Sequence, residues 1–398
     1  MELREELRQL APFCALTFIT GTATAISAYW VIYFNQIGLS FTQISFMLAL
    51  ASIAPMIFEV PTGAVADALG RKISVTAGFF LVGIATIAVA FSDSFYYLAG
   101  ILFFSAAANT LQTGAFDAWI VDYAKSLKRT TVHSALSKTR SFAFAGAFIS
   151  LVASSFITAQ YGIKMLWIFS GAAMAVAGVY GYLFCPENFS RRQIHVSMLR
   201  HSISASVKGA KYALTHRVLK YILAVTVITA FFGVWQIAWQ PLFVEVGVPL
   251  PHIGIIFAAL MLVAIAFSAL SPRFKALFGT DRRALIAGEI ISGILFASVL
   301  FVSSSLQSAA LFLLLGAIGS MTNPIYESYF HKFVPSPQRA TISSFKSWLS
   351  NGAGIIAVLA GGLAMDTIGP RMTMAALSVL VIPTILLYLR IDDGRGSR

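Results

Sequence analysis

Charged residues are scarce in this chain of 398 residues. Asp, Glu, Lys and Arg make up 11% of it and hydrophobic residues 58%, whereas soluble chains carry roughly 25% charged residues. This composition excludes a soluble globular protein and indicates an integral membrane protein. A membrane-spanning helix uses about 20 apolar residues. The length therefore accommodates about twelve spans with short connections and leaves no room for a soluble catalytic domain.

Cysteine is almost absent, since Cys14 and Cys185 are the only two. They do not form a disulfide framework, and we expect two free thiols. Patterns for other chemistry are missing as well. There is no Walker loop for ATP, no metal-ligand spacing among the six histidines and no nucleophile elbow around a serine. The sequence therefore predicts no cofactor, no metal site and no enzyme activity.

Long apolar runs, separated by polar or helix-breaking residues, fill most of the chain. The predicted spans are residues 11–34, 41–63, 73–91, 95–120, 134–159, 165–184, 219–243, 253–270, 284–302, 306–329, 341–365 and 370–389. The start, Met1 to Leu10, leads into an apolar run that is too long for a signal peptide, so we expect the first span to be retained. The predicted fold class is an all-α integral membrane protein with twelve transmembrane helices.

Positive charge is unevenly distributed over the connections between the spans. Of the 28 Lys and Arg residues, only Lys164 and Arg371 lie on the side opposite the termini. Because cytoplasmic connections carry the excess of basic residues, we predict cytoplasmic termini and insertion in the inner (plasma) membrane of a bacterium. Position 164 should then be accessible from outside, and positions 128 and 208 from inside.

The connection from Cys185 to Lys220 is the only long one, and it has no acidic residue after Glu187. Its bases alternate with apolar residues, so it could lie on anionic headgroups as an amphipathic helix. A solvated linker that obeys the positive-inside bias is the alternative. The net charge of +12 is explained by this membrane topology, and a nucleic-acid partner is not expected.

The two halves of the chain share residues at a nearly constant offset. At 209 residues, the matches are Trp30, Phe34, Gly38 and Ile44 with Trp239, Phe243, Gly247 and Ile253; at 210, they are Asp117, Arg129 and Ser134 with Glu327, Arg339 and Ser344. Chance similarity among apolar helices is the alternative, but the matches favour two homologous six-span halves. We predict a six-helix bundle over 1–184, a central cytoplasmic loop over 185–218 and a second bundle over 219–398.

A short motif follows the second span and reads Gly63-Ala64-Val65-Ala66-Asp67-Ala68-Leu69-Gly70-Arg71-Lys72. It resembles the signature of the major facilitator superfamily (MFS): Gly, three residues, Asp, two residues, Gly, Arg, then Lys or Arg. The twelve spans, the repeat and the central loop extend the resemblance over nearly the whole chain. A degraded copy, Gly279-Thr280-Asp281-Arg282-Arg283, follows the eighth span.

The resemblance implies a secondary active transporter that works by alternating access. It also implies two bundles related by a pseudo-two-fold axis, with a cavity lined by spans one, four, seven and ten. In the family, the Asp and Arg of the motif help to lock the cytoplasmic side. That role falls here on Asp67 and Arg71, with Asp122 as the partner of Arg71. The alternative is that these charges only set the topology.

Polar side chains at helical spacing on those four spans, together with neighbouring aromatic residues, are predicted to line the cavity. They are Thr20, Thr24, Ser27, Trp30, Asn109, Thr113, Trp235, Gln236, Gln240, Asn323 and Tyr326. A single hydroxyl can instead bond to its own helix. Trp30 and Trp239 can instead belong to the interfacial aromatic belt.

Charged residues within spans cost on the order of a few kcal/mol each and are functional candidates. Matching depth pairs Asp117 with Arg140 and Glu327 with Lys346, and we predict two ion pairs with structural or gating roles. Glu59 is the predicted proton-coupling carboxylate, with a packing role as the alternative. Glu289 is another functional candidate, with a snorkelling interfacial position as the alternative. Asp93, Glu245 and Asp366 are assigned to outer span ends.

The predicted function is proton-coupled efflux of an amphipathic drug or metabolite. Span five lacks the Pro of the Gly-Pro signature that is usual in the family's drug exporters, and sugar-porter loop signatures are missing. Import or facilitated passage of a small organic solute therefore remains the alternative. A channel or an intramembrane enzyme is a further class without supporting motifs. The expected partners are a small-molecule substrate, the lipid bilayer and protons, and the expected functional unit is a monomer.

Overall fold

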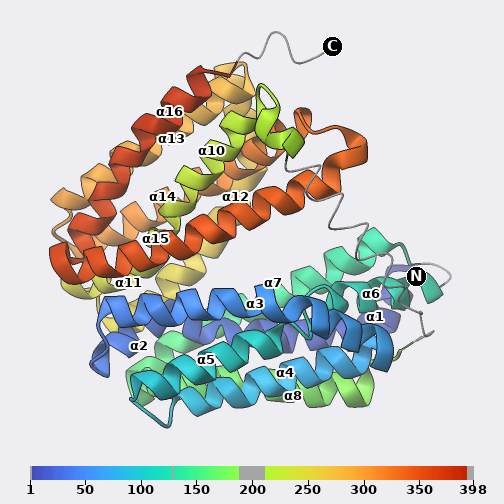
Figure 1. Ribbon diagram of the computed structural model, residues 1–398. Helices are drawn as coiled ribbons and strands as arrows, with labels where there is room; N and C mark the ends of the chain where they lie inside the picture. The colour runs from blue at the N-terminus through green and yellow to red at the C-terminus, as the bar shows by residue number, and fades with distance from the viewer. Residues whose placement is uncertain (1, 128–129, 188–210, 392–398) are drawn as a thin grey trace. The chain divides into compact units, whose positions relative to one another are not determined.

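A computed structural model describes residues 2–127, 130–187 and 211–391, and every regular element in these ranges is a helix (Figure 1). The chain divides into two compact units. Unit 1 comprises Met1–Leu39, Met47–Ile194 and Leu250–Ala258. Unit 2 comprises Ser40–Phe46, His195–Pro249 and Ala259–Arg398. Most of the predicted central loop and positions 128 and 208 lie outside the described residues.

The helices account for the predicted spans. Ten helical stretches among the described residues are long and apolar enough to cross a membrane. The last of them, Ser336–Leu389, is interrupted at Gly369 (φ 81°) and Pro370 and therefore holds two spans. A further span is split into α5 (Phe95–Asn109) and α6 (Ala115–Ser126). The described chain thus contains the twelve predicted spans, and the all-α membrane fold is confirmed.

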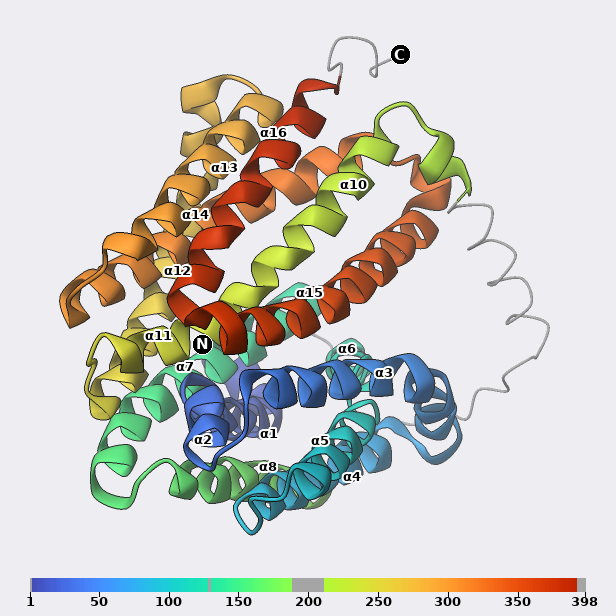
Figure 2. The ribbon, with the colours of Figure 1, turned by 60° about the vertical axis from the view of Figure 1, so that its left-hand side comes forward.

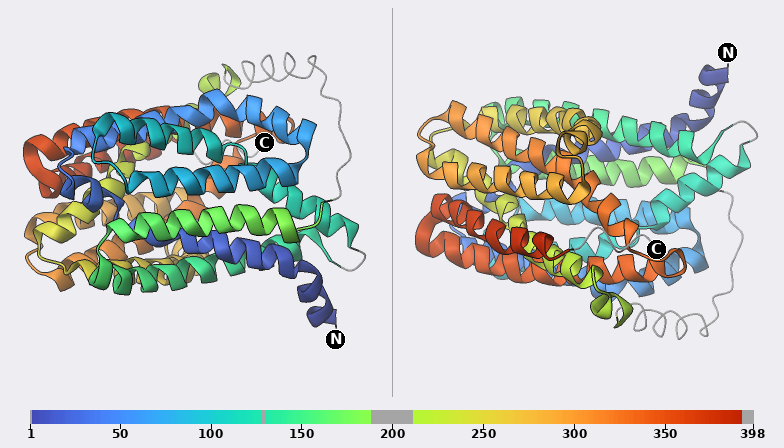
Figure 3. Two further views of the ribbon diagram at one scale, coloured as in Figure 1. Left: turned by 90° about the horizontal axis from the view of Figure 1, so that it is seen from below. Right: turned by 90° about the horizontal axis from the view of Figure 1, so that it is seen from above.

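Unit 1 contains the first six spans, except for Ser40–Phe46, which include the start of the second span and belong to unit 2. Its remaining helices are α1 (Glu2–Thr22), η1 (Ala23–Ala28), α2 (Trp30–Gln36), α3 (Phe41–Leu69), α4 (Arg71–Val89), α7 (Val132–Tyr161) and α8 (Lys164–Phe184). Helix α4 packs along α5 and α8 (Figure 2), and α8 also lies beside α1 (Figure 3). Phe13 of α1 meets Trp119 of α6 edge to face, with ring centroids 5.0 Å apart. Apolar contacts between several helices therefore form the core of this unit.

Two helices of unit 1 approach each other at backbone distance. Gly21 of α1 and Gly146 of α7 lie where a Cβ atom would collide with the other helix, at Ala143 O and Phe18 O respectively. Only a residue without a side chain allows this packing. Gly146 lies in the segment of span five that lacks the Pro of the drug-exporter signature. Its close approach to Phe18 O gives this glycine a role in helix packing.

Unit 2 contains the remaining spans, except for Leu250–Ala258, which include the start of the eighth span and belong to unit 1. Its helices are α10 (Leu219–Ala230), η2 (Phe231–Val234), α11 (Trp235–Glu245), α12 (Leu250–Phe278), α13 (Asp281–Ser298), η3 (Val299–Phe301), α14 (Ser305–Lys332), η4 (Ser336–Gln338), α15 (Arg339–Ala376), η5 (Leu377–Leu380) and α16 (Val381–Leu389). Helix α10 lies between α15 and α16 (Figure 2). The buried residues Tyr329, Phe330 and Tyr388 belong to the apolar core of unit 2. This packing surrounds the polar site described below.

Glycines with positive φ values recur in the two halves at the offset found in the sequence. Gly38 and Gly247 have φ values of 93° and 75°, and Gly70 and Gly279 have 101° and 77°. These positive values favour glycine, and each pair is separated by 209 residues. Spans one and seven both change to a 3-10 helix part-way, at η1 and η2. The same turns and the same interruption therefore occur in both halves, which supports the predicted repeat.

Candidate functional site

Unit 2 contains a partly open cavity of about 620 Å³. Side chains from α10, α13, α14, α15 and α16 line it, and η2 and the start of α11 contribute Phe232 and Trp235. A 3-10 segment within a span often marks a functional site, and here it places two aromatic rings at the cavity wall. The predicted cavity residues Trp235, Asn323 and Tyr326 all line this cavity.

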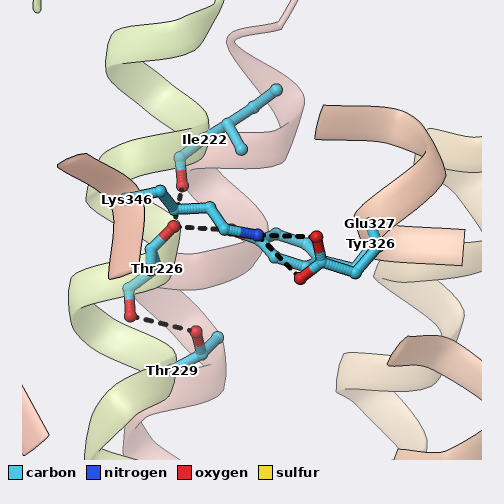
Figure 4. A network of polar contacts seen from close by, with 6 residues as sticks. All are labelled: Ile222, Thr226, Thr229, Tyr326, Glu327 and Lys346. Atoms are coloured by element: carbon cyan, nitrogen blue, oxygen red, sulfur yellow. Dashed lines mark hydrogen bonds and ion pairs between the residues drawn. The ribbon is translucent and has the colours of Figure 1, made fainter. Parts of the chain in front are cut away.

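An ion pair between α14 and α15 lies in the same cavity wall. The Lys346 Nζ atom donates to both carboxylate oxygens of Glu327, at 2.6 and 2.7 Å (Figure 4). The side chain of Lys346 is 11% exposed and that of Glu327 is 44% exposed. The structure thus brings the two predicted partners together in the wall of the cavity.

Two aromatic rings surround the ammonium group of Lys346. Its Nζ atom lies 4.4 Å from the ring centroid of Phe330 and 5.2 Å from that of Tyr326. Cation–π attraction at these distances adds to the ion pair. The ammonium is therefore held by one carboxylate and two rings, which compensates for its burial within the span.

A chain of hydroxyl groups links α14 to α10. The hydroxyl groups of Tyr326 and Thr226 are 2.5 Å apart, Thr226 also donates to Ile222 O at 2.9 Å, and Thr229 donates to Thr226 O at 3.2 Å (Figure 4). These bonds position the Tyr326 ring beside Lys346. Thr226 and Thr229 of span seven therefore support the site through their hydrogen bonds, and Thr226 does so by direct contact with the Tyr326 hydroxyl.

Glu289 of α13 is the second carboxylate in the cavity wall. The alternative that it snorkels at the interface is wrong, because its helix turns the side chain toward the cavity between α14 and α16. The described residues form no hydrogen bond or ion pair with this carboxylate. Sequence alone could not show this, since span nine was not among the spans expected to line a cavity.

Two further predicted residues of span seven lie in different surroundings. Gln240 is fully buried, whereas Gln236 is exposed. Trp239 is 4% exposed, and its ring lies 4.5 Å from that of Phe312. This aromatic packing excludes Trp239 from the interfacial belt and assigns it to the core of unit 2.

The predicted cavity residues of unit 1 make local contacts. Thr20 donates to Thr17 O at 2.9 Å, and Ser27 donates to Thr24 O at 2.6 Å. These are the bonds to the residue's own helix that the sequence left open as an alternative.

The span-four residues behave similarly. Asn109 accepts a hydrogen bond from Gln112 at 2.6 Å, and Thr113 donates to Thr110 O at 3.3 Å. Both side chains are exposed, and Trp30 is partly buried. The cavity of unit 2 is lined by residues of unit 2 alone, so a role of the unit 1 residues in substrate binding stays a prediction.

The signature loop is held by Arg71 at the start of α4. Its guanidinium forms an ion pair with Asp122 and donates to Ala118 O at 2.8 Å, both in α6. The backbone N–H of Lys72 donates to Glu187 at 2.9 Å. Sequence reasoning found the first contact and missed Glu187, which lies beyond span six and reaches the loop only through the fold.

Asp67, the remaining member of the predicted lock, is partly buried near the end of α3. No hydrogen bond or ion pair of its carboxylate occurs within the described parts of the chain. Arg71 and Asp122 therefore form an ion pair that does not include Asp67. The locking role of all three residues stays a prediction.

Replacing Arg71 should lower the transport rate strongly and change the unfolding midpoint of the protein only slightly. Partly exposed ion pairs contribute about 0–1 kcal/mol, so Arg71→Gln should change the unfolding midpoint little. If the contact acts as a gate, the variant should lower the transport rate at least about tenfold. Lys72→Gln removes the same charge next to it and serves as the control. Equal losses in both variants would indicate that the loop charges only set the topology.

The second predicted ion pair differs from the first in its exposure. Arg140 Nη2 lies 3.3 Å from Asp117 Oδ2, and the side chains are 65% and 60% exposed. The predicted pairing is present, and α6 and α7 leave both side chains exposed. The ion pairs in the two halves therefore contribute differently to stability.

Glu59 is exposed on α3, so the low-dielectric surroundings assumed for a proton-coupling carboxylate are not found at this position. The described residues provide no side-chain partner for it. Its role stays a prediction from the sequence, and the acids that line the unit 2 cavity are Glu289 and Glu327.

Three charged contacts were not found by sequence reasoning, because each joins distant segments. Lys138 pairs with Glu6, with side chains 18% and 17% exposed. Arg371 donates to Glu245 at 2.7 Å. The carboxylate of Asp366 accepts from the backbone N–H groups of Phe41 and Thr42 at 2.9 and 2.7 Å. These last residues begin α3, where a negative charge is favourable. Asp366 is thus a helix cap rather than only an outer span end.

The chain matches the family model of the Major Facilitator Superfamily over residues 13–246 and 222–398. It belongs to this superfamily. An uncharacterized MFS-type transporter of Bacillus subtilis (strain 168), YxaM, is 24% identical over 388 residues, covering 94% of this chain and 93% of the relative. The multi-drug resistance efflux pump PmrA homolog of Lactococcus lactis subsp. lactis (strain IL1403) is 22% identical, covering 93% of this chain and 91% of the relative.

The fold also matches solved MFS structures. A point mutant of the nucleoside transporter NupG superposes with a TM-score of 0.80 at 12% identity, covering 96% of this chain and 99% of NupG. This likeness concerns the fold alone. Membership makes the chain a membrane transporter of the MFS, a family of transporters rather than an enzyme class. A small-molecule substrate and the lipid bilayer follow as partners.

Proposed function

We propose that this MFS transporter exports an amphipathic drug or metabolite by alternating access, in exchange for protons. The observation that carries the proposal is the cavity of about 620 Å³ in unit 2, where charged groups and aromatic rings share one wall. Its volume is within the roughly 300–1,000 Å³ of sites that hold drug-sized molecules. An amphipathic molecule fits such a cavity, because its apolar part can contact the rings and its polar part can contact the charged groups.

Two further observations support efflux and coupling. One relative carries the name of a multi-drug efflux pump homolog, although its substrates are not assigned to this chain by 22% identity. The cavity also contains carboxylates, Glu289 and Glu327, and a carboxylate within a span can exchange a proton as its surroundings become wet or dry. We place the protein in a bacterial inner membrane, as a monomer with both termini in the cytoplasm.

Proteoliposomes containing the purified full-length protein test the proposal. An antiporter uses a pH gradient that is acidic inside to drive substrate uptake, because protons leave as substrate enters. A fluorescent amphipathic probe should therefore accumulate under this gradient, and a protonophore should abolish the accumulation. Uptake driven only by an acidic exterior would indicate a symporter and hence import. Uptake that ignores the pH gradient and only equilibrates the probe would indicate facilitated passage.

The orientation can be tested with single cysteines. Lys164→Cys should react with an impermeant thiol reagent in intact cells, and Lys125→Cys should react only after permeabilisation. The native background is low, because Cys14 and Cys185 are buried and burial raises the pKa of the Cys185 thiol to about 12, so that it stays protonated and unreactive. Labelling of position 125 from outside would contradict the proposed topology.

A further inference from the structure

The charges in the wall of the unit 2 cavity do not balance. The wall contains the carboxylates of Glu289 and Glu327, and Lys346 is its one Lys or Arg side chain. Lys346 binds both oxygens of Glu327. His331 also lines the cavity. Counted over Asp, Glu, Lys and Arg, the wall has one carboxylate more than it has basic groups, and Glu289 is the carboxylate that Lys346 does not bind.

The surroundings of Glu289 offer no compensating group from the protein. Tyr326 and Glu327 face the cavity from α14, Lys346 from α15 and Tyr388 from α16. Of these, the only cation is already paired with Glu327. An ionised carboxylate within a span is costly unless a positive charge offsets it. A bound proton or a bound cation can supply that charge, and the wall of the cavity decides which molecules fit beside it.

Aromatic rings in the same cavity wall suit a large apolar cation. Phe232 and Phe296 stack with centroids 5.4 Å apart and planes 6° apart, and Trp235 lines the same cavity. Ring faces attract positively charged groups, most strongly where water is excluded. The rings can thus hold both the apolar body of a molecule and a charge that is spread over it.

An anion has no comparable place in the cavity. It would have to displace Glu327 from Lys346 and would then face two unpaired carboxylates. The ammonium of Lys346 is also covered by the rings of Phe330 and Tyr326, at 4.4 and 5.2 Å. Binding of an anion thus costs the existing ion pair, whereas binding of a cation at Glu289 costs no protein contact.

We propose that the transported molecule is a lipophilic organic cation whose positive charge is held by the carboxylate of Glu289. This inference rests on the proposed transport of an amphipathic molecule and names its chemical class. It assigns substrate recognition to α13, and it leaves the Glu327–Lys346 pair intact during binding.

Three probes with the same aryl groups and different charge test the proposal. Tetraphenylphosphonium is a permanent cation that carries no exchangeable proton, triphenylphosphine oxide is neutral, and tetraphenylborate is an anion. Binding of each probe to the purified full-length protein would be measured by equilibrium dialysis at constant pH. Flux of each probe would be measured in proteoliposomes made from the same protein.

The wild-type protein should bind the cation at least about tenfold more tightly than the neutral probe, which is about 1.4 kcal/mol. Glu289→Gln should remove this preference and leave the affinity for the neutral probe unchanged. Glu289→Asp keeps the charge and should keep the preference even if the affinity falls. Asp93→Asn, an exposed carboxylate of the connection between α4 and α5, is the control and should behave as wild type.

Tighter binding of the anion than of the cation would overturn the inference. An unchanged preference for the cation in Glu289→Gln would overturn it as well. If Glu289→Gln alters only the pH dependence of flux, the residue serves protons and not the cation. Saturable wild-type flux of the neutral or anionic probe, without a preference for the cation, would sink this inference and leave the proposed function standing. Absence of flux for all three probes would count against the proposed function itself.

Discussion

Lys346→Met is expected to abolish transport and to lower the free energy of unfolding by about 3 kcal/mol, near the lower end of the cost of breaking a buried ion pair. The variant leaves Glu327 without its partner in the wall of the cavity. Because the Glu327 side chain is 44% exposed, water offsets part of the loss and the upper end of the range is not expected. The unfolding midpoint of the purified protein and counterflow in proteoliposomes measure the two effects.

The double variant Lys346→Met with Glu327→Gln tests the reason for this loss. Removing both charges leaves no uncompensated group, so the double variant should regain most of the stability that either single variant loses. Additive losses would show that the two residues act separately, for instance on substrate. Recovery of stability without recovery of transport would show that the pair has a role in transport beyond folding.

Asp117 and Arg140 provide the matched control from the other half of the chain. Asp117 corresponds to Glu327 at the offset of 210 residues, but the Asp117 and Arg140 side chains are 60% and 65% exposed. An exposed pair contributes about 0–1 kcal/mol. Asp117→Asn and Arg140→Gln should therefore each change the unfolding midpoint little, and the double variant should show little recovery. Equal penalties in both halves would contradict the distinction that exposure makes between the two pairs.

Gly146→Ala is expected to lower the free energy of unfolding by about 1–3 kcal/mol, the usual cost of overpacking. The new Cβ would collide with Phe18 O and would lie 3.1 Å from the Phe18 carbonyl carbon. These are backbone atoms of α1, so a side-chain rotation cannot relieve the contact and the two helices must separate.

Gly100→Ala is the control for this prediction. Gly100 lies in α5, and a Cβ there would meet no atom within 4 Å. Alanine is favoured over glycine within a helix by roughly 0.5–1 kcal/mol, so Gly100→Ala should match or exceed the wild-type unfolding midpoint. A similar decrease in both variants would show that helix propensity or insertion, and not the contact between α1 and α7, determines the effect.

The contacts found by sequence reasoning are those that periodicity and depth determine. Glu327 and Lys346 could be paired because antiparallel spans place residues at equal distances from the shared end at the same depth. Arg71 and Asp122 could be paired because the family motif names one partner and the position at the end of the fourth span suggests the other. Burial could not be predicted in this way, as the exposed pair of Asp117 and Arg140 shows.

The sequence by itself determined the membrane class and the twelve spans, and it predicts the side on which the positive charges lie and the repeat of the two halves. These properties follow from composition, from the length of apolar runs and from spacing, which require no knowledge of how helices rotate about their axes. Only the tertiary structure decided which side chains share a cavity. Rotation of α13 brings Glu289 into the wall beside Tyr326 and Lys346, and close packing of many helices sets that rotation, which no single span encodes.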